Sequence, residues 1–367
     1  MSVLFLECIA PWLEGPARGL SQHVPVTALQ HVNFGSKNKL GLVDASDRTG
    51  FTCRTHSYPP GFAGKLSALF APIIRAGVNR AFAAMTPTNR IRPQVICPFP
   101  YCEPWVCDIP AGNLVYYNVD DYAQYAWANK QQVRAREDAL IARAHATICV
   151  SIHQAKAFRQ RHPSHASKIH HLPHGLAPDM LNPEPETPPR KNVVGYVGNL
   201  SDRVDWVFVD KVAGHAPELD FEFVGNAAPS DAEWAMQREE AFARKNVRHL
   251  GPVPQKAVPP HYWNSAVNWM PYDARHPFNI ASSPTKIFDA FGAGRPFLST
   301  DLPEVACYPD KIAIARTAQE AADFLREAVS SHDPLKAKQL RDFASGHVWL
   351  RRAEEILGIL CDKPGKE

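Results

Sequence analysis

Short apolar runs alternate along the chain with longer segments in which apolar residues recur every three or four positions. A short apolar run is typical of a buried strand, and the longer period is typical of a helix packed on one side. The predicted strands are residues 114–119, 146–150, 193–197, 219–224, 247–250, 267–270 and 296–300, and the predicted helices are residues 123–145, 152–161, 206–216, 232–244 and 348–361. Strands that alternate with helices predict an α/β fold built on parallel sheets.

A proline-rich break divides this pattern. Residues 172–191 contain six prolines and almost no periodicity, which is typical of a linker. We therefore expect a Rossmann-like domain at residues 1–175, a linker at 176–191 and a second Rossmann-like domain at 192–345, with the two domains facing a central cleft. Residues 346–367 carry one apolar stripe, and we expect this last helix to pack back on the first domain.

Composition excludes several classes of protein. The chain has 367 residues, of which 45% are hydrophobic and 21% charged, and it contains no apolar run near the length that spans a membrane. The N-terminus has no basic lead-in and no small-residue cleavage site, so we expect no signal peptide. The eight cysteines contain no C-x-x-C pair, which favours a reducing cytoplasm and no metal site.

Charge is unevenly distributed. Residues 1–180 carry a net charge of +7 and the remainder −4, and residues 51–100 hold six basic residues and no acidic one. A basic first half predicts an anionic partner. Because no nucleic-acid-binding motif accompanies the charge, an anionic membrane surface or a phosphate-bearing substrate is the expected partner, and nucleic acid is not.

The first candidate site lies at residues 195–206, between a predicted strand and a predicted helix, and contains Gly198, Asn199 and Arg203. Glycine there lets the backbone approach a phosphate, and the helix N-terminus supplies N–H donors. The pattern is not G-x-G-x-x-G, so a tight structural turn explains it equally well.

The second candidate site lies at residues 277–300. Ser283 and Pro284 suit the start of a short helix, which places Lys286 in its first turn, where a cation opposes the helix dipole. Asp289 follows three residues later on the same face. Lys286 could hold a diphosphate and Asp289 the ribose hydroxyls of a nucleotide; the alternative is a solvated Lys–Asp pair.

Residues 284–300, P-T-K-I-F-D-A-F-G-A-G-R-P-F-L-S-T, resemble the P-x-K-x-x-E-Y-x-A-x-G-x-P-V-V signature of the nucleotide-sugar glycosyltransferases of the GT-B fold, including the group 1-like families. Residues 143–178, 194–206 and 246–254 resemble further segments of the same group. The resemblance implies two Rossmann-like domains, a metal-independent glycosyl transfer without a cofactor, and a donor site in the second domain. It assigns to that site Gly198, Asn199, Arg203, Val253, Ser283, Lys286 and Asp289, with the backbone at Val253 near the base.

Two departures concern the stereochemistry of the reaction. Asp289 stands where glutamate is usual, and Ala281 stands where retaining members often carry an earlier glutamate. Residues 114–122 instead resemble the bacterial exopolysaccharide glucuronosyltransferases, an inverting family, and that resemblance implies that Asp120 is the general base. The alternative is that Asp120 or Asp121 only caps the following helix.

Residues 61–85 form a basic amphipathic segment without acidic residues. The apolar positions are Phe62, Leu66, Leu69 and Ile73, and the basic positions are Lys65, Arg75 and Arg80. Such a segment can lie at a membrane surface, or it can be a core helix hairpin with snorkelling ends. Because Pro72 interrupts it, we expect no single continuous helix.

The sequence therefore predicts a hexosyltransferase of polysaccharide or glycoconjugate synthesis. Its donor would be a nucleotide diphosphate sugar, most simply UDP-linked, and its acceptor a saccharide or a polyprenyl-linked saccharide. The expected location is the cytoplasm, with contact to the inner face of the plasma membrane through residues 61–85 left open. The alternatives are a nucleotide-sugar epimerase of the same fold and a non-catalytic relative that binds a nucleotide sugar or a partner enzyme.

Overall fold

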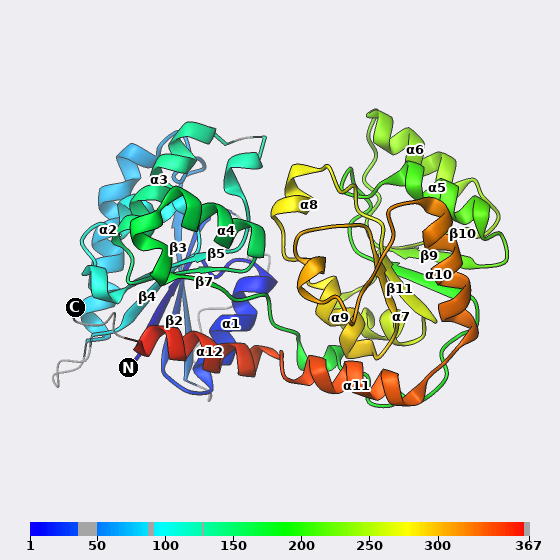
Figure 1. Cartoon of the computed structure of the whole chain (residues 1–367). Helices are drawn as coiled ribbons and strands as arrows, with labels where there is room; N and C mark the ends of the chain where they lie inside the picture. The colour runs from blue at the N-terminus through cyan, green and yellow to red at the C-terminus, as the bar shows by residue number, and fades with distance from the viewer. Residues whose placement is uncertain (36–49, 87–91, 127, 363–367) are drawn as a thin grey trace. The chain divides into compact units, whose positions relative to one another are not determined.

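The computed structural model describes residues 1–35, 50–86, 92–126 and 128–362. The chain divides into two units, residues 1–175 together with 349–367, and residues 176–348. Each unit has a parallel sheet of its own with helices on both faces (Figure 1).

The sheet of the first unit has the strand order β3-β2-β1-β4-β5-β6-β7, and neighbouring strands pair in parallel. The strands are β1 Val3–Leu6, β2 Val26–Asn33, β3 Phe51–Tyr58, β4 Gln94–Cys97, β5 Leu114–Asn118, β6 Ala146–Cys149 and β7 Ile169–His171. The chain reverses its direction of travel across the sheet between β1 and β4. This reversal is the switch point of a doubly wound sheet, at whose carboxyl edge ligands bind.

Helices cover both faces of this sheet. They are α1 Pro11–Ser21, α2 Ser67–Ala84, α3 Lys130–Arg143, α4 Ile152–Arg161 and α12 Trp349–Cys361, with 3-10 turns η1 Pro100–Trp105, η2 Ala111–Asn113, η3 Tyr122–Gln124 and η4 Pro163–Lys168. One hydrophobic cluster joins α1 and α12 to one face of the strands, and a second joins α2, α3 and α4 to the other. The predicted long helix at 123–145 is shorter than expected, because Asn129 caps α3 and the preceding residues form η3 and a loop.

The C-terminal helix α12 packs directly on α1 (Figure 1). A Cβ atom on Gly15 would lie 2.3 Å from the Trp349 ring, and one on Gly19 would lie 2.5 Å from the Trp349 carbonyl oxygen. Two glycines four residues apart share one helix face. They therefore allow the two helix backbones of this pair to approach closely.

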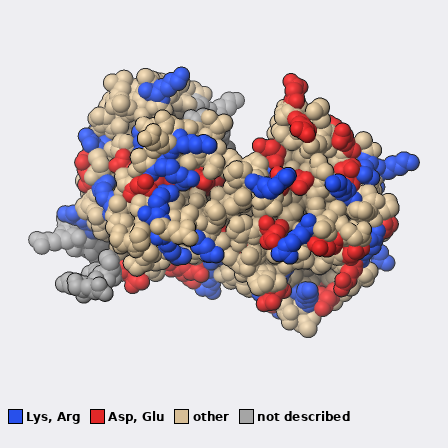
Figure 2. Space-filling view, turned by 45° about the horizontal axis from the view of Figure 1, so that its top comes forward, with Lys and Arg blue, Asp and Glu red and all other residues tan. Residues whose placement is uncertain are grey.

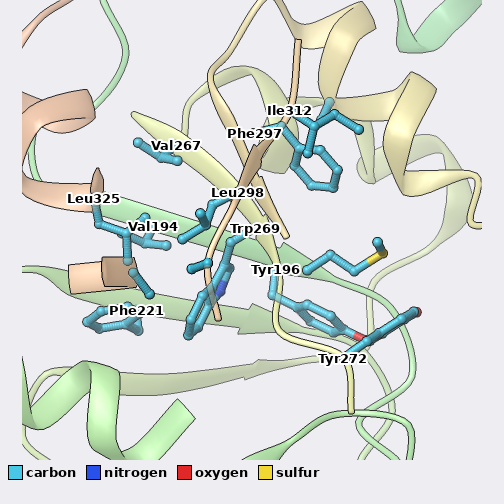
Figure 3. Close-up of a cluster of buried hydrophobic side chains, with 14 of the residues drawn as sticks. Val194, Tyr196, Phe221, Val267, Trp269, Tyr272, Phe297, Leu298, Ile312 and Leu325 are labelled. Carbon is cyan, nitrogen blue, oxygen red and sulfur yellow. The ribbon is translucent and has the colours of Figure 1, made fainter. Parts of the chain in front are cut away.

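The second unit has the strand order β10-β9-β8-β11-β12-β13. The strands are β8 Val193–Val197, β9 Asp220–Val224, β10 Val247–Gly251, β11 Val267–Met270, β12 Phe297–Ser299 and β13 Ala313–Ile314. The helices are α5 Trp206–His215, α6 Glu233–Phe242, α7 Pro259–Trp263, α8 Pro277–Ala281, α9 Lys286–Ala293, α10 Ala318–Ser330 and α11 Pro334–Ser345, with 3-10 turns η5 Pro178–Met180, η6 Gln255–Ala257 and η7 Val305–Cys307. Its switch point lies between β8 and β11. Figure 3 shows the buried aromatic and aliphatic side chains of its core, among them Tyr196, Phe221 and Trp269.

The proline-rich stretch at 176–191 is not a free linker, which corrects the sequence prediction. Met180 is buried, and the Asn182 side chain donates a hydrogen bond to the Ala293 carbonyl at 3.1 Å. The Arg295 guanidinium donates to the carbonyls of Pro185 and Thr187. Prolines lack an N–H donor but leave main-chain carbonyls available as acceptors, so this irregular stretch is held on the second unit by side-chain donors.

Helix α2 is continuous through Pro72, contrary to the sequence prediction. Its inward face carries Ile74 and Val78, both fully buried. Of the apolar face that the sequence predicted, only Phe62 is buried, while Leu66, Leu69 and Ile73 are 40%, 66% and 54% exposed. No helix in the described part of the chain is long and apolar enough to cross a membrane.

Candidate active site

A cavity of about 340 Å³ lies at the carboxyl edge of the sheet in the second unit. It is open to solvent on one side and is lined by residues at the ends of β8, β9 and β10, by α7 and by the start of α9: Val197, Gly198, Asn199, Val224, Gly225, Asn226, Pro252, Val253, Gln255, Val258, Tyr262, Thr285, Lys286 and Asp289. Five of the predicted donor residues are in this set: Gly198, Asn199, Val253, Lys286 and Asp289. The topology of parallel strands brings them together, since their carboxyl ends share one edge.

Two glycines shape the floor of this cavity. Gly198 and Gly225 both have φ near +150°, and a Cβ on Gly225 would lie 1.8 Å from the Gly198 carbonyl oxygen. A Cβ on Gly198 would lie 2.4 Å from the Lys286 Nζ atom. Because glycine has no side chain, the Lys286 ammonium can approach the backbone of the loop after β8.

Lys286 is held between two tyrosines. Its Nζ atom lies 5.1 Å from the Tyr196 ring centroid and 5.5 Å from that of Tyr272, whose side chains are neighbours in Figure 3. Burial alone would raise the pKa of Tyr272. The Lys286 ammonium, which also donates a hydrogen bond to this phenol, and the nearby Arg203 guanidinium outweigh burial and lower it. The geometry thus fixes a cation at the first residue of α9, where the helix dipole requires an anion to compensate it.

Asp289 lies one turn further along α9 and is half-buried. Burial raises the pKa of its carboxyl to about 7, against the opposing effects of the Lys286 charge and of hydrogen bonds with Thr285 and Tyr262. A carboxyl with this pKa changes charge near neutrality. It can accept hydrogen bonds from hydroxyl groups of a ligand in the cavity when it is ionised.

Arg203 and Ser283 do not line the cavity. The Arg203 guanidinium donates to Asn279 Oδ1 at 2.8 Å and to Ser282 Oγ at 3.1 Å, and so it holds α8 and the residue that follows this helix. Ser283 is buried and donates to Glu304. The N-cap position of α9 is Thr285, which makes no side-chain capping hydrogen bond, rather than Ser283 as the sequence predicted.

Sequence reasoning missed the second glycine loop and the tyrosines. Val-Gly-Asn occurs twice, at 197–199 and at 224–226, each time at the end of a strand. That repeat was a readable signal for a paired loop. Tyr262 and Tyr272 had no such signal, since each reaches the site only through the packing of α7 and the segment after β11.

Asp120 lies in the first unit, two residues after β5. Its carboxylate accepts hydrogen bonds from the Tyr125 hydroxyl at 2.7 Å and from the Asp121 N–H at 2.9 Å. Asp121 instead caps η3 and pairs with Arg134 at 2.8 Å. Asp121 is therefore engaged in structural contacts, while Asp120 is partly exposed and oriented by Tyr125.

The described residues contain no group of three or more His, Cys, Asp or Glu side chains placed to hold a metal ion.

Comparison with solved structures identifies the fold of the chain. HepE from Anabaena, whose crystal structure holds UDP and glucose, aligns over 98% of this chain and 99% of its own, with 16% identity and a TM-score of 0.70. Sucrose-phosphate synthase from Thermosynechococcus elongatus aligns over 98% of both chains, with 14% identity and a TM-score of 0.68. The fold is GT-B.

Residues 203–358 match the family described as "Glycosyl transferase-like". TuaH of Bacillus subtilis, assigned as a teichuronic acid biosynthesis glycosyltransferase, is 24% identical over 184 residues, or 48% of this chain and 45% of its own length. The chain therefore spans about half the length of this curated relative. The resemblance to GT-B glycosyltransferases predicted from the sequence is confirmed, and the matched region contains α9 with Lys286 and Asp289.

Proposed function

We propose that the protein is a glycosyltransferase that transfers a hexosyl group from a UDP-sugar to a saccharide or polyprenyl-linked saccharide. The observation that carries the proposal is the cavity of the second unit, in which Lys286 reaches a glycine loop and Asp289 follows one turn later. A cation beside a backbone-lined loop suits a diphosphate, and a half-buried carboxyl nearby suits ribose hydroxyls. HepE, whose crystal structure contains UDP, has the same fold.

Lys286 would stabilise the departing UDP. Breaking the bond between the sugar and the diphosphate leaves negative charge on the phosphate oxygens, and an ammonium already in place stabilises it in the transition state. Tyr272 positions this ammonium through its hydrogen bond. In this proposal the reaction needs neither a metal ion nor a cofactor, because the Lys286 ammonium supplies the compensating charge.

Asp120 would be the general base of an inverting transfer. A carboxylate that takes the proton of the acceptor hydroxyl raises its nucleophilicity as it attacks the anomeric carbon. The hydrogen bond from Tyr125 fixes one oxygen of Asp120, and a fixed base contributes more than a mobile one.

The proposed setting is polysaccharide or glycoconjugate synthesis at the cytoplasmic face of the membrane. Leu66, at the N-cap position of α2, forms an exposed strip with Leu69 and Ile73 of the helix, and Lys65 immediately precedes this strip. An apolar strip with basic residues and no acidic one favours contact with an anionic lipid surface.

Isothermal calorimetry with UDP and a panel of UDP-sugars tests the donor site. We expect one UDP-sugar to bind, and Lys286→Ala to weaken that binding about 10- to 100-fold, since a charged hydrogen bond contributes about 1.5–3 kcal/mol. Lys211→Ala, on the exposed side of α5, should bind as the wild type does. A folded protein that binds no nucleotide would contradict the proposal.

The rate of sugar transfer from the bound UDP-sugar tests the role of Asp120 as general base. Asp120→Asn should leave the donor affinity unchanged and reduce transfer about 10²- to 10⁴-fold, whereas Asp108→Asn, on an exposed carboxylate of the same unit, should change neither. Conversion of the UDP-sugar without any acceptor would instead indicate an epimerase.

A further inference from the structure

We propose that a second cavity, in the first unit, binds the acidic group and the ring of a saccharide acceptor that carries a phosphate or a carboxylate. This inference rests on the proposed function, which requires an acceptor. The cavity has a volume of about 300 Å³, and its lining includes Lys65, Tyr101, Tyr122, Asn129, Gln132 and Arg136. Tyr101 and Tyr122 follow β4 and β5, so the cavity lies at the carboxyl edge of the sheet, beside the β1–β4 switch point where doubly wound folds bind ligands.

The charges that line this cavity are of one sign. Lys65 and Arg136 are the charged residues among its described lining, and no acidic side chain is present there. Figure 2 shows many Lys and Arg side chains on the visible face of this unit. An anionic ligand would therefore meet attraction without local repulsion.

Arg136 is set apart from the other arginines of α3. Arg134 pairs with Asp121 and Glu137, and Arg143 donates to the carbonyls of Val106 and Ile109. Arg136 is half-buried and, among the described residues, makes no hydrogen bond or ion pair. A guanidinium removed from part of its water needs an acceptor, and its planar donors match a carboxylate or a phosphate.

Hydrogen bonds to the protein interior hold the two tyrosines that line the cavity, Tyr101 and Tyr122. The Tyr101 hydroxyl donates to Glu7 at 2.9 Å, and the Tyr122 hydroxyl donates to the Pro98 carbonyl at 3.0 Å. Glu7 is buried, contacts His31 Nδ1 at 2.5 Å, and has a φ of 49°, a left-handed conformation that residues other than glycine rarely adopt. Side-chain contacts thus hold Glu7 in a strained conformation from which it anchors Tyr101.

These features together indicate an acidic sugar rather than a bare anion. Because both phenol protons are already donated to the protein, Tyr101 and Tyr122 contribute mainly their aromatic carbon to the lining, which suits the C–H groups of a pyranose ring. The amides of Asn129 and Gln132 can bond sugar hydroxyls. Phosphate and carboxylate are equivalent ligands for Arg136 and Lys65, so the test must distinguish between them.

Ligand-observed NMR titration on the full chain, with glucose 6-phosphate, glucuronic acid, glucose and inorganic phosphate as probes, tests the inference. We expect at least one acidic sugar to bind ten times more tightly than glucose or inorganic phosphate. Arg136→Gln should abolish that preference, Arg136→Lys should retain part of it, and Lys130→Gln, an exposed residue outside the cavity lining, should leave it unchanged. Thermal unfolding of each variant checks that it is folded.

The outcomes separate the two proposals. Binding of UDP without any preference for acidic sugars would overturn this inference and leave the proposed function standing. Inorganic phosphate that binds as tightly as glucose 6-phosphate would also overturn it, because the cavity would then recognise an anion and no sugar. Acidic-sugar binding that is lost in Arg136→Gln, in a protein that binds no UDP, would support the cavity and contradict the proposed function.

Discussion

At the scale of single residues, the environment decides what each side chain of α9 can do. Lys286 and Asp289 are three positions apart on one helix, yet Lys286 reaches the glycine loop, whereas Asp289 is half-buried and interacts with Thr285 and Tyr262. Burial raises the pKa of Asp289 to about 7. One turn of helix therefore presents an amine and a carboxyl that titrates near neutrality.

The affinity for UDP-glucose should accordingly rise with pH through about 7, because the ionised Asp289 accepts hydrogen bonds from ribose hydroxyls more strongly than the protonated form does. UDP-glucose has no phosphate that titrates in this range, so the change reports the protein. Calorimetry between pH 5.5 and 8.5 measures it. In Asp289→Asn the affinity should be about tenfold lower above pH 8 and independent of pH; a pH dependence retained in that variant would refute the assignment.

The Asp289 carboxyl should also make the free energy of unfolding depend on pH. This free energy should fall as pH rises, whereas the affinity for UDP-glucose should increase. The folded protein holds this proton up to about pH 7, whereas the unfolded chain releases it near pH 4. The wild type therefore loses stability as pH rises from about 4 to about 7. Asp289→Asn has no carboxyl at this position and should not lose stability in this way. In urea titrations, the free energy of unfolding of the variant minus that of the wild type should therefore increase from about pH 4 to about pH 7.

At the scale of elements, the contact between α1 and α12 depends on glycine. Gly19→Ala should destabilise the protein although alanine favours helix by about 1 kcal/mol, because its Cβ would lie 2.5 Å from the backbone carbonyl of Trp349. Gly358→Ala is the matched control, since a Cβ there meets nothing within 4 Å, and it should be stabilising. Calorimetric melting temperatures test the pair; a rise for both would show that the helices are not tightly apposed.

The exposed strip of α2 allows a second comparison between elements. Leu69 and Leu335 are both 66% exposed, the first on α2 and the second on α11. If α2 contacts lipid, Leu69→Glu should lower co-sedimentation with phosphatidylglycerol vesicles several-fold, because it places a carboxylate in the apolar strip. Leu335→Glu should not change it, and equal effects of both substitutions would exclude a specific role of α2.

At the scale of the whole molecule, each unit has its own sheet and its own core. A ligand stabilises the part of a protein that it contacts. UDP-glucose should therefore slow hydrogen exchange in the loops at 197–199 and 224–226 and at the start of α9, and leave the strands of the first unit unaffected. Mass spectrometry of peptic fragments resolves these segments, and protection confined to the first unit would contradict the donor site.

Much of the fold and part of the site could be predicted from local sequence. The periodicity located β8, β11 and α4 at their observed bounds, because a strand buried on both faces must be apolar and a one-sided helix must repeat its apolar positions. The first-turn lysine with an aspartate three residues later predicted that both side chains of α9 face one side, since that spacing fixes one helix face whatever surrounds it, and both line the cavity; that α9 binds a nucleotide stays a prediction.

Only the tertiary structure decided which faces are covered and which side chains meet. Periodicity showed an apolar face on α2 but not that Leu69 and Ile73 would stay exposed. It gave no sign that the prolines at 176–191 would be fastened to the second unit, or that Arg203 would bond Asn279 instead of lining the cavity. Tyr262 and Asn226 come from elements far apart in the chain, and it is the parallel winding of the sheet, which gathers the carboxyl ends of its strands at one edge, that brings them to Lys286.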